Sequence, residues 1–285
     1  MTTTKHIFRL TILALFGLTD CNNSTQTKTE QLTTTIDSTT NLTVIQDKKQ
    51  DKEIDTTKYD INSLVDDTNR IAKILTEGEF HSDEVWENAD KEKWFGLFID
   101  SGYYIAETKI TTKRVIDGLY DENDSNKTGW KVQTEPYHQS IILIAGINTL
   151  SNHKIQQVVL TKNQIFPGDT LRFNYLGIDY KMFATAWKKK KQNDREWLAY
   201  RDYKLYLTAN KNGQVITDLL VAASYFDDKM ISIIFAGDID GDGFLDLIID
   251  TSPKYSMQSI TLYLSKPADK GHLLKVVGDN SSFGC

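Results

Sequence analysis

The sequence IIFAGDIDGDGFLDLII, at residues 233–249, places four aspartates and three glycines in and beside a loop between two apolar runs. The apolar runs are short and rich in isoleucine, which is typical of buried strands. Glycine permits backbone conformations that other residues avoid, so Gly243 allows a sharp bend between them. The stretch therefore predicts a β-hairpin whose connecting loop carries a concentrated negative charge.

The spacing of the four carboxylates indicates a calcium site. They occupy positions 1, 3, 5 and 9 of the loop that begins at Asp238, and Gly243 occupies position 6. Calcium takes about six to eight oxygen ligands, and this alternation turns the first three side chains toward one centre. Without a cation the clustered charges would repel one another. We therefore predict that residues 238–246 bind Ca²⁺; the alternative is an acidic hairpin that binds no ion.

Two known calcium motifs share this arrangement. An EF-hand requires an acidic residue at position 12, where this chain has Ile249, and helices where this chain has strand-like runs. The loop instead resembles that of the FG-GAP and related VCBS-type repeats of integrin α-subunits and many bacterial exported proteins. The resemblance implies five ligands: the side chains of Asp238, Asp240, Asp242 and Asp246, and the carbonyl of Phe244. Because the motif occurs once, it predicts a single hairpin that a calcium ion holds together, rather than a propeller.

The N-terminus has the features of an export signal. Lys5 and Arg9 precede an apolar run over residues 10–18, which is too short to span a bilayer. The run ends in Leu18-Thr19-Asp20-Cys21, which resembles the lipobox of bacterial lipoproteins, although Asp20 stands where a small uncharged residue is usual. The resemblance implies that residues 1–20 are a signal peptide and that Cys21 is acylated. The alternative is a cleaved signal peptide with an ordinary thiol at Cys21.

The next segment is polar. Residues 22–58 contain 11 threonines and no aromatic residue, so they cannot bury enough apolar area to offset the entropy of ordering. Together with the acylated Cys21 they predict a flexible linker over 21–58 that holds a folded body away from the membrane. The predicted localisation is therefore the bacterial cell envelope, with the membrane as a partner through the lipid anchor. Which membrane and which face are left open.

Composition limits the other partners. The 285 residues include 33 Lys and Arg against 39 Asp and Glu, a formal net charge of -6, and the basic residues are spread along the chain without the strong basic footprint that nucleic acid requires. We therefore expect no nucleic-acid partner. With Cys21 acylated, Cys285 has no partner for an internal disulfide, so the fold must be stable without one. A monomer is expected.

The folded body is predicted to be α+β, predominantly antiparallel β. Its start has the apolar spacing of a helix, with Asp60 as the N-cap, Gly78 as the end, and Ile61, Leu64, Val65, Ile71, Ala72 and Leu75 on one face. Strand-like runs follow at 94–99, 103–105, 141–145 and 158–160, then an alternating run at 171–175 and a hairpin turn at Asn212-Gly213. The turn at 167–169 suggests a boundary between an N-terminal α+β region (59–170) and a β-rich domain (171–285).

No catalytic motif is recognisable. The chain has no Gly-x-Ser-x-Gly elbow, no His-Glu-x-x-His pair, no Cys-x-x-Cys and no phosphate-binding glycine loop. His81 with Asp83 and Glu84 is the one polar cluster that catalysis could use, and a solvated loop is the favoured interpretation. We expect a calcium-binding envelope lipoprotein with a non-enzymatic binding or scaffolding role toward a protein or glycan. The alternative is an exported hydrolase with a structural calcium ion.

Overall fold

The computed structural model describes residues 62–64, 69–122, 125–188, 199–211 and 213–284. The chain divides into two units, residues 1–53 and residues 54–285. The first unit lies wholly outside the described residues. The predicted signal peptide, Cys21 and the predicted linker fall within residues 1–58, all of which lie outside the described residues.

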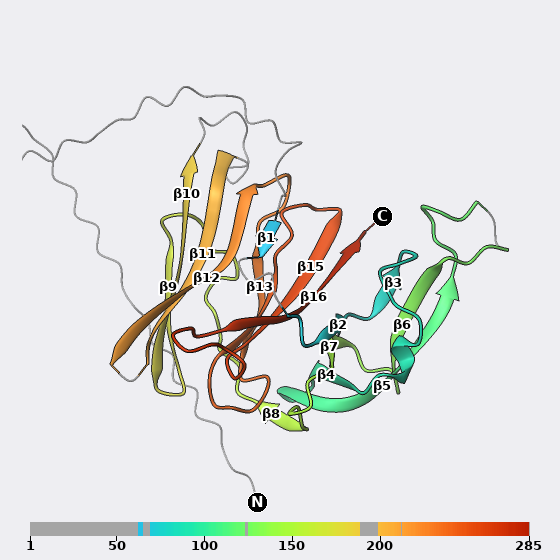
Figure 1. Cartoon of the computed structure of the whole chain (residues 1–285), viewed down its shortest axis with the longest axis horizontal. Helices are drawn as coiled ribbons and strands as arrows, with labels where there is room; N and C mark the ends of the chain where they lie inside the picture. The colour runs from blue at the N-terminus through green and yellow to red at the C-terminus, as the bar shows by residue number, and fades with distance from the viewer. Residues whose placement is uncertain (1–61, 65–68, 123–124, 189–198, 212, 285) are drawn as a thin grey trace, which may run out of the picture. The chain divides into compact units, whose positions relative to one another are not determined.

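The described strands of the second unit pair antiparallel in three sheets (Figure 1). The five-stranded sheet has the order β1 (Asn62–Leu64), β12 (Gln214–Tyr225), β11 (Tyr200–Lys211), β10 (Ile178–Lys188) and β9 (Thr170–Tyr175). The four-stranded sheet has the order β13 (Ser232–Gly237), β14 (Asp246–Asp250), β15 (Met257–Leu264) and β16 (Lys275–Phe283). The seven-stranded sheet has the order β2 (Lys73–Leu75), β7 (Ser140–Ala145), β4 (Trp94–Ile99), β5 (Tyr103–Val115), β6 (Gly129–Glu135) and β3 (Gly78–Phe80), and β8 (His153–Ile155) pairs with β5.

The predicted antiparallel β character is confirmed. The runs at 94–99, 141–145 and 171–175 form strands, and β11 and β12 pair as a hairpin around Gly213. The run at 158–160 is not a strand: Val158 is buried and its N–H donates to the carbonyl of Ala236 (2.9 Å), while Val159 is 85% exposed. A short 3-10 turn, η2 (Ala89–Lys91), is present, and no α-helix occurs among the residues that the structure describes.

The predicted N-terminal helix lies partly outside the described residues, which omit 61 and 65–68. The described end of that segment is extended and forms β2. Ile74 and Leu75 are both buried because successive strand residues point to opposite faces, and each face of this sheet borders a core. The adjacent apolar residues at this point therefore serve two cores on either side of a strand.

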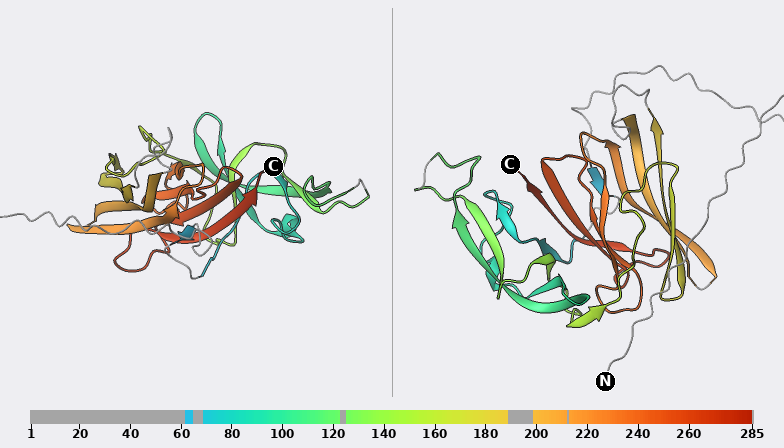
Figure 2. Two further views of the ribbon diagram at one scale, coloured as in Figure 1. Left: turned by 90° about the horizontal axis from the view of Figure 1, so that it is seen from above. Right: turned by 180° about the vertical axis from the view of Figure 1, so that it is seen from behind.

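The four-stranded sheet is buried on both faces. All five residues of β14 are buried, and Leu247 and Ile249 belong to the core shared with the five-stranded sheet. Ile248 belongs to the core shared with the seven-stranded sheet. The strands of this sheet lie between the other two sheets (Figure 1 and Figure 2). The short isoleucine-rich runs of the sequence thus form the central layer, where a strand needs apolar residues on both faces.

The two cores join segments from both sides of residue 170. Val158 and Ile165 pack with the five-stranded sheet, and Phe235 packs with the seven-stranded sheet. Where the segment before β2 meets β16, the carbonyl of Val277 accepts hydrogen bonds from the N–H groups of Ile71 (2.9 Å) and Ala72 (2.8 Å). The adjacent Gly278 permits this approach, since a Cβ there would lie 2.7 Å from the carbonyl oxygen of Ala72.

Candidate metal centre

The aspartate loop connects β13 and β14 at the central sheet. The two strands pair antiparallel up to Gly237 and Asp246, so the hairpin predicted at 233–249 is present. Gly241 and Gly243 have φ values of 76° and 84°, in the left-handed region where a side chain is strained. The two glycines therefore let the chain turn tightly enough to bring the aspartates together.

Three of the four predicted carboxylates converge. One carboxylate oxygen from each of Asp238, Asp240 and Asp246 lies within 4.8 Å of the others. Asp242 is not in this group; its Oδ2 accepts a hydrogen bond from the Ser265 hydroxyl (2.8 Å) and its Oδ1 accepts one from the N–H of Phe244 (2.8 Å). The ring of Phe244 lies 3.9 Å from the ammonium of Lys211, and its carbonyl as a ligand stays a prediction.

Asp246 connects the loop to the neighbouring strand and is fully buried. Its Oδ2 accepts hydrogen bonds from the N–H groups of Ile239 (2.7 Å) and Asp240 (3.2 Å), and its Oδ1 accepts one from Ser265 (2.7 Å). Burial and the charge of Asp240 raise the pKa of Asp246 well above its usual value. Its negative charge is therefore costly unless a cation lies nearby.

Asp240 has an unsatisfied oxygen. The residue is 6% exposed, and its Oδ1 is buried without a hydrogen-bond partner. Burial raises the pKa of Asp240 to about 6, helped by the negative charges of Asp242 and Asp238 and opposed by Lys266. A buried acceptor without a donor costs stability, and a cation would supply what it lacks.

Asp238 fixes the loop from within. Its Oδ1 accepts hydrogen bonds from the N–H groups of Gly241 (2.7 Å) and Asp242 (3.0 Å), and its Oδ2 accepts one from Gly243 (2.8 Å). Each carboxylate oxygen can accept more than one contact, so these bonds leave capacity for an ion. The three hydrogen bonds hold the carboxylate of Asp238 in one orientation.

Residues distant in sequence hold the same loop from outside. The N–H of Asp238 donates to the hydroxyl of Tyr175 (2.9 Å), and that hydroxyl donates to the carbonyl of Gln156 (3.0 Å). His153 Nε2 lies 3.3 Å from the carbonyl oxygen of Asp238. Burial raises the pKa of Tyr175 to about 12, and the charge of Asp238 adds to this, so the hydroxyl keeps its proton. These supporting residues could not be predicted, because no local sequence pattern connects them to the loop.

The chemistry of the cluster suits a hard cation. Its three converging groups are all carboxylates, and oxygen donors favour Ca²⁺ or Mg²⁺ over metals that prefer nitrogen or sulfur. It is the only cluster of three or more His, Cys, Asp or Glu side chains within ligating reach of one another in the described part of the chain.

No family model matches the chain, and comparisons with curated proteins and with solved structures found no match. Within the described residues, no helix has the length and apolar character needed to cross a membrane.

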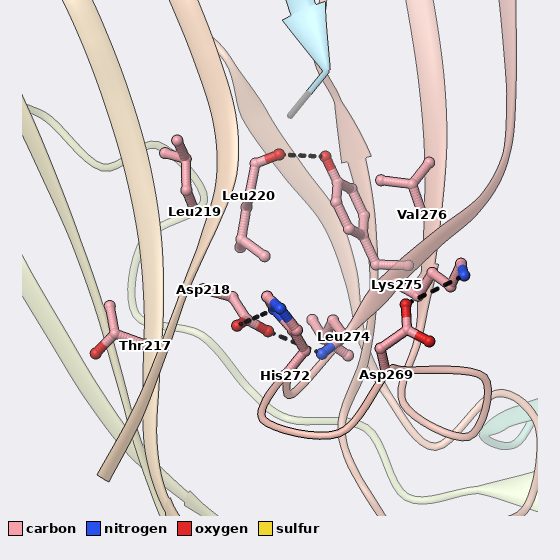
Figure 3. A pocket seen from close by; sticks show the side chains of 10 residues that line it. Thr217, Asp218, Leu219, Leu220, Asp269, His272, Leu274, Lys275 and Val276 are labelled. Carbon is pink, nitrogen blue, oxygen red and sulfur yellow. Dashed lines mark hydrogen bonds and ion pairs between the residues drawn. The ribbon is translucent and has the colours of Figure 1, made fainter. Parts of the chain in front are cut away.

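A separate cavity of about 360 Å³ lies between β12 and the segment that leads into β16 (Figure 3). Its buried carboxylate, Asp218, is already engaged: Oδ1 lies 3.0 Å from His272 Nδ1, and Oδ2 accepts hydrogen bonds from the N–H groups of Leu273 (2.6 Å) and Leu274 (3.0 Å). Both oxygens are used to hold the 272–274 segment. The arrangement therefore stabilises a turn.

Proposed function

We propose that residues 238–246 bind one calcium ion, and that the ion fixes the central hairpin of an exported binding or scaffolding lipoprotein. The observation that carries this proposal is the convergence of three carboxylates, one of which, Asp240, has a buried Oδ1 without a hydrogen-bond partner. Calcium accepts irregular arrangements of carboxylate and carbonyl oxygens, whereas magnesium demands a near-ideal octahedron and keeps its water. The irregular loop therefore favours calcium.

The position of the site supports a structural role for the ion. Asp246 is the first residue of β14, whose side chains enter both large cores. Asp240 and Asp246 are buried, and Asp246 is hydrogen-bonded to the backbone. An ion at these carboxylates would bring the loop and the start of β14 together and neutralise charges that otherwise oppose folding.

Calcium should raise the melting temperature of the protein. A ligand that binds the folded state alone stabilises it by about 2.7 kcal/mol at roughly a hundredfold excess over its dissociation constant. We expect this shift in wild type and in Asp227→Asn, a matched change at an exposed aspartate, and a clearly smaller shift in Asp240→Asn, which loses the negative charge. Melting after treatment with a chelator and after adding calcium measures it; an equal shift in Asp240→Asn would contradict the proposal.

The calcium effect should also depend on pH. Because the pKa of Asp240 rises from 3.8 to about 6 on folding, the metal-free folded state binds more protons than the unfolded chain between these values. Metal-free stability therefore falls as pH rises from about 4 to about 6, and the raised pKa of Asp246 adds to the fall in the same direction. Calcium binds the ionised carboxylates, so its shift should be larger at pH 7 than at pH 5. Asp117 and Asp169 have lowered pKa values, so their contributions change below this window.

The lipid anchor rests on the sequence alone. We propose that Cys21 carries the lipid and that residues 22–58 connect it to the folded body. Labelling cells with radioactive palmitate should mark the wild-type protein and leave Cys21→Ser unlabelled, while Cys285→Ser, the matched change at the other cysteine, should keep the label. Label retained in Cys21→Ser would exclude this anchor.

A further inference from the structure

A cavity of about 680 Å³ lies away from the calcium loop. It is formed by residues 81–84, which follow β3, by the turn after β5, by Ser256 and by the end of β16. Its volume falls within the range of sites that hold small organic ligands. None of the aspartates of the calcium loop lines it.

Three large apolar side chains at this cavity are exposed. Leu119 is 59% exposed, Tyr120 is 66% exposed and Phe283 is 53% exposed. Scattered exposed apolar residues are ordinary, but three gathered around one cavity form an apolar surface that a ligand would remove from water. The cavity therefore offers hydrophobic binding energy at its rim.

Hydrogen bonds hold this rim in place. Oδ2 of Asp121 accepts the N–H groups of Asp117 and Thr128, both at 2.8 Å, which closes the turn that carries Leu119 and Tyr120. On the other side, the N–H of Phe283 donates to Glu84 Oε1 (2.7 Å). Because these contacts fix the backbone beneath the apolar side chains, a ligand would meet a surface that needs little further ordering.

The polar part of the cavity is acidic. Asp83, Glu84 and His81 line it, and no lysine or arginine among the described residues does. The Nδ1 of His81 lies 2.8 Å from Asp117 Oδ1, and Oδ2 of Asp117 is buried without a hydrogen-bond partner. Burial opposes ionisation, but the N–H of Leu119 and the His81 ring hold the pKa of Asp117 below its usual value. The carboxylates of Asp83, Glu84 and Asp117 therefore outnumber the one base, His81, at this end of the cavity.

We propose that this cavity binds an organic cation, an ammonium or guanidinium group carried on an aromatic or aliphatic body. The exposed Asp83 would pair with the charge, while Glu84, whose two oxygens already accept the N–H groups of His81 and Phe283, would add negative potential. The aromatic rings of Tyr120 and Phe283 would contact both the apolar body and the cation. A free amine and a basic peptide side chain share this chemistry. This ligand class depends on the binding role proposed above.

Three ligands of similar size and different charge test the inference: 2-phenylethylamine, 2-phenylethanol and 3-phenylpropionate. Calorimetric titration into the full folded chain, saturated with calcium, should show saturable binding of the amine, about tenfold weaker binding of the alcohol and no binding of the carboxylate. Equal binding of all three, or no binding of the amine, would overturn the inference. A capped lysine peptide, titrated beside the free amine, shows by its relative affinity which source fits better.

Two exposed tyrosines provide matched variants. Tyr120→Ala should weaken amine binding about tenfold, whereas Tyr137→Ala, 63% exposed and not part of this cavity, should leave it unchanged. Equal affinities in the two variants would contradict the assignment. The calcium-dependent melting shift is measured in the same preparations. If that shift persists without amine binding, the cavity inference alone fails; if the shift is absent, the calcium proposal fails separately.

Discussion

Asp246→Ala is expected to lower the free energy of unfolding by about 3 kcal/mol, even in the absence of calcium. The fully buried carboxylate accepts hydrogen bonds from three backbone N–H groups, those of Ile239, Asp240 and Ser265. Each buried donor left without an acceptor costs about 1–3 kcal/mol. Removing a negative charge that Asp240 repels offsets part of this loss. Asp246 thus stabilises the loop in its own right.

Urea denaturation in the presence of a chelator measures the effect of Asp246→Ala without any contribution from the ion. Asp227→Ala is the matched control, because Asp227 is exposed and should change stability by less than about 0.5 kcal/mol. Equal midpoints for the two variants would show that the backbone contacts of Asp246 do not hold the hairpin.

Phe235→Ala is expected to cost about 3–5 kcal/mol, the range for an aromatic residue removed from a core. Phe235 is 1% exposed, and its ring centroid lies 5.1 Å from that of Tyr103 on the seven-stranded sheet. The adjacent Ile234, at the irregular pairing of β13, is 37% exposed. Ile234→Ala should therefore cost about 1 kcal/mol or less.

The comparison between Phe235→Ala and Ile234→Ala tests the packing of the central sheet. Both changes lie in β13, so a general effect on that strand would appear in both variants. A large difference in urea midpoint supports a core between the four-stranded and seven-stranded sheets. Similar losses of stability would contradict the assignment of Phe235 to that core.

The central hairpin could be predicted because its signals are local. The apolar runs on either side of Asp238–Asp246 reflect burial of β14 on both faces, and Gly241 and Gly243 occupy backbone positions that other residues avoid. The start of the folded body was harder to predict. Ile74 and Leu75 belong to different cores, and nothing in the local spacing distinguishes that arrangement from one face of a helix.

Side-chain partners from distant segments could not be predicted. Asp242 was expected to converge with the other three aspartates; it lies outside their group, and Ser265, just after β15, donates a hydrogen bond to its Oδ2. The hydroxyl of Tyr175 reaches Asp238 across 63 sequence positions. Asp117, which contacts His81, lies 36 positions away. Such contacts depend on how the sheets pack, which local residue patterns do not encode.

The central claim is that one calcium ion is bound by the aspartate loop, and calorimetric titration of calcium into chelator-treated protein tests it most directly. Asp240→Asn keeps the size of the side chain but removes the charge beside the unpartnered oxygen. Wild type and Asp227→Asn should each bind one calcium ion per chain, and Asp240→Asn should bind calcium at least about tenfold more weakly because the site loses one negative charge. No binding by wild type, or unchanged binding by Asp240→Asn, would contradict the claim.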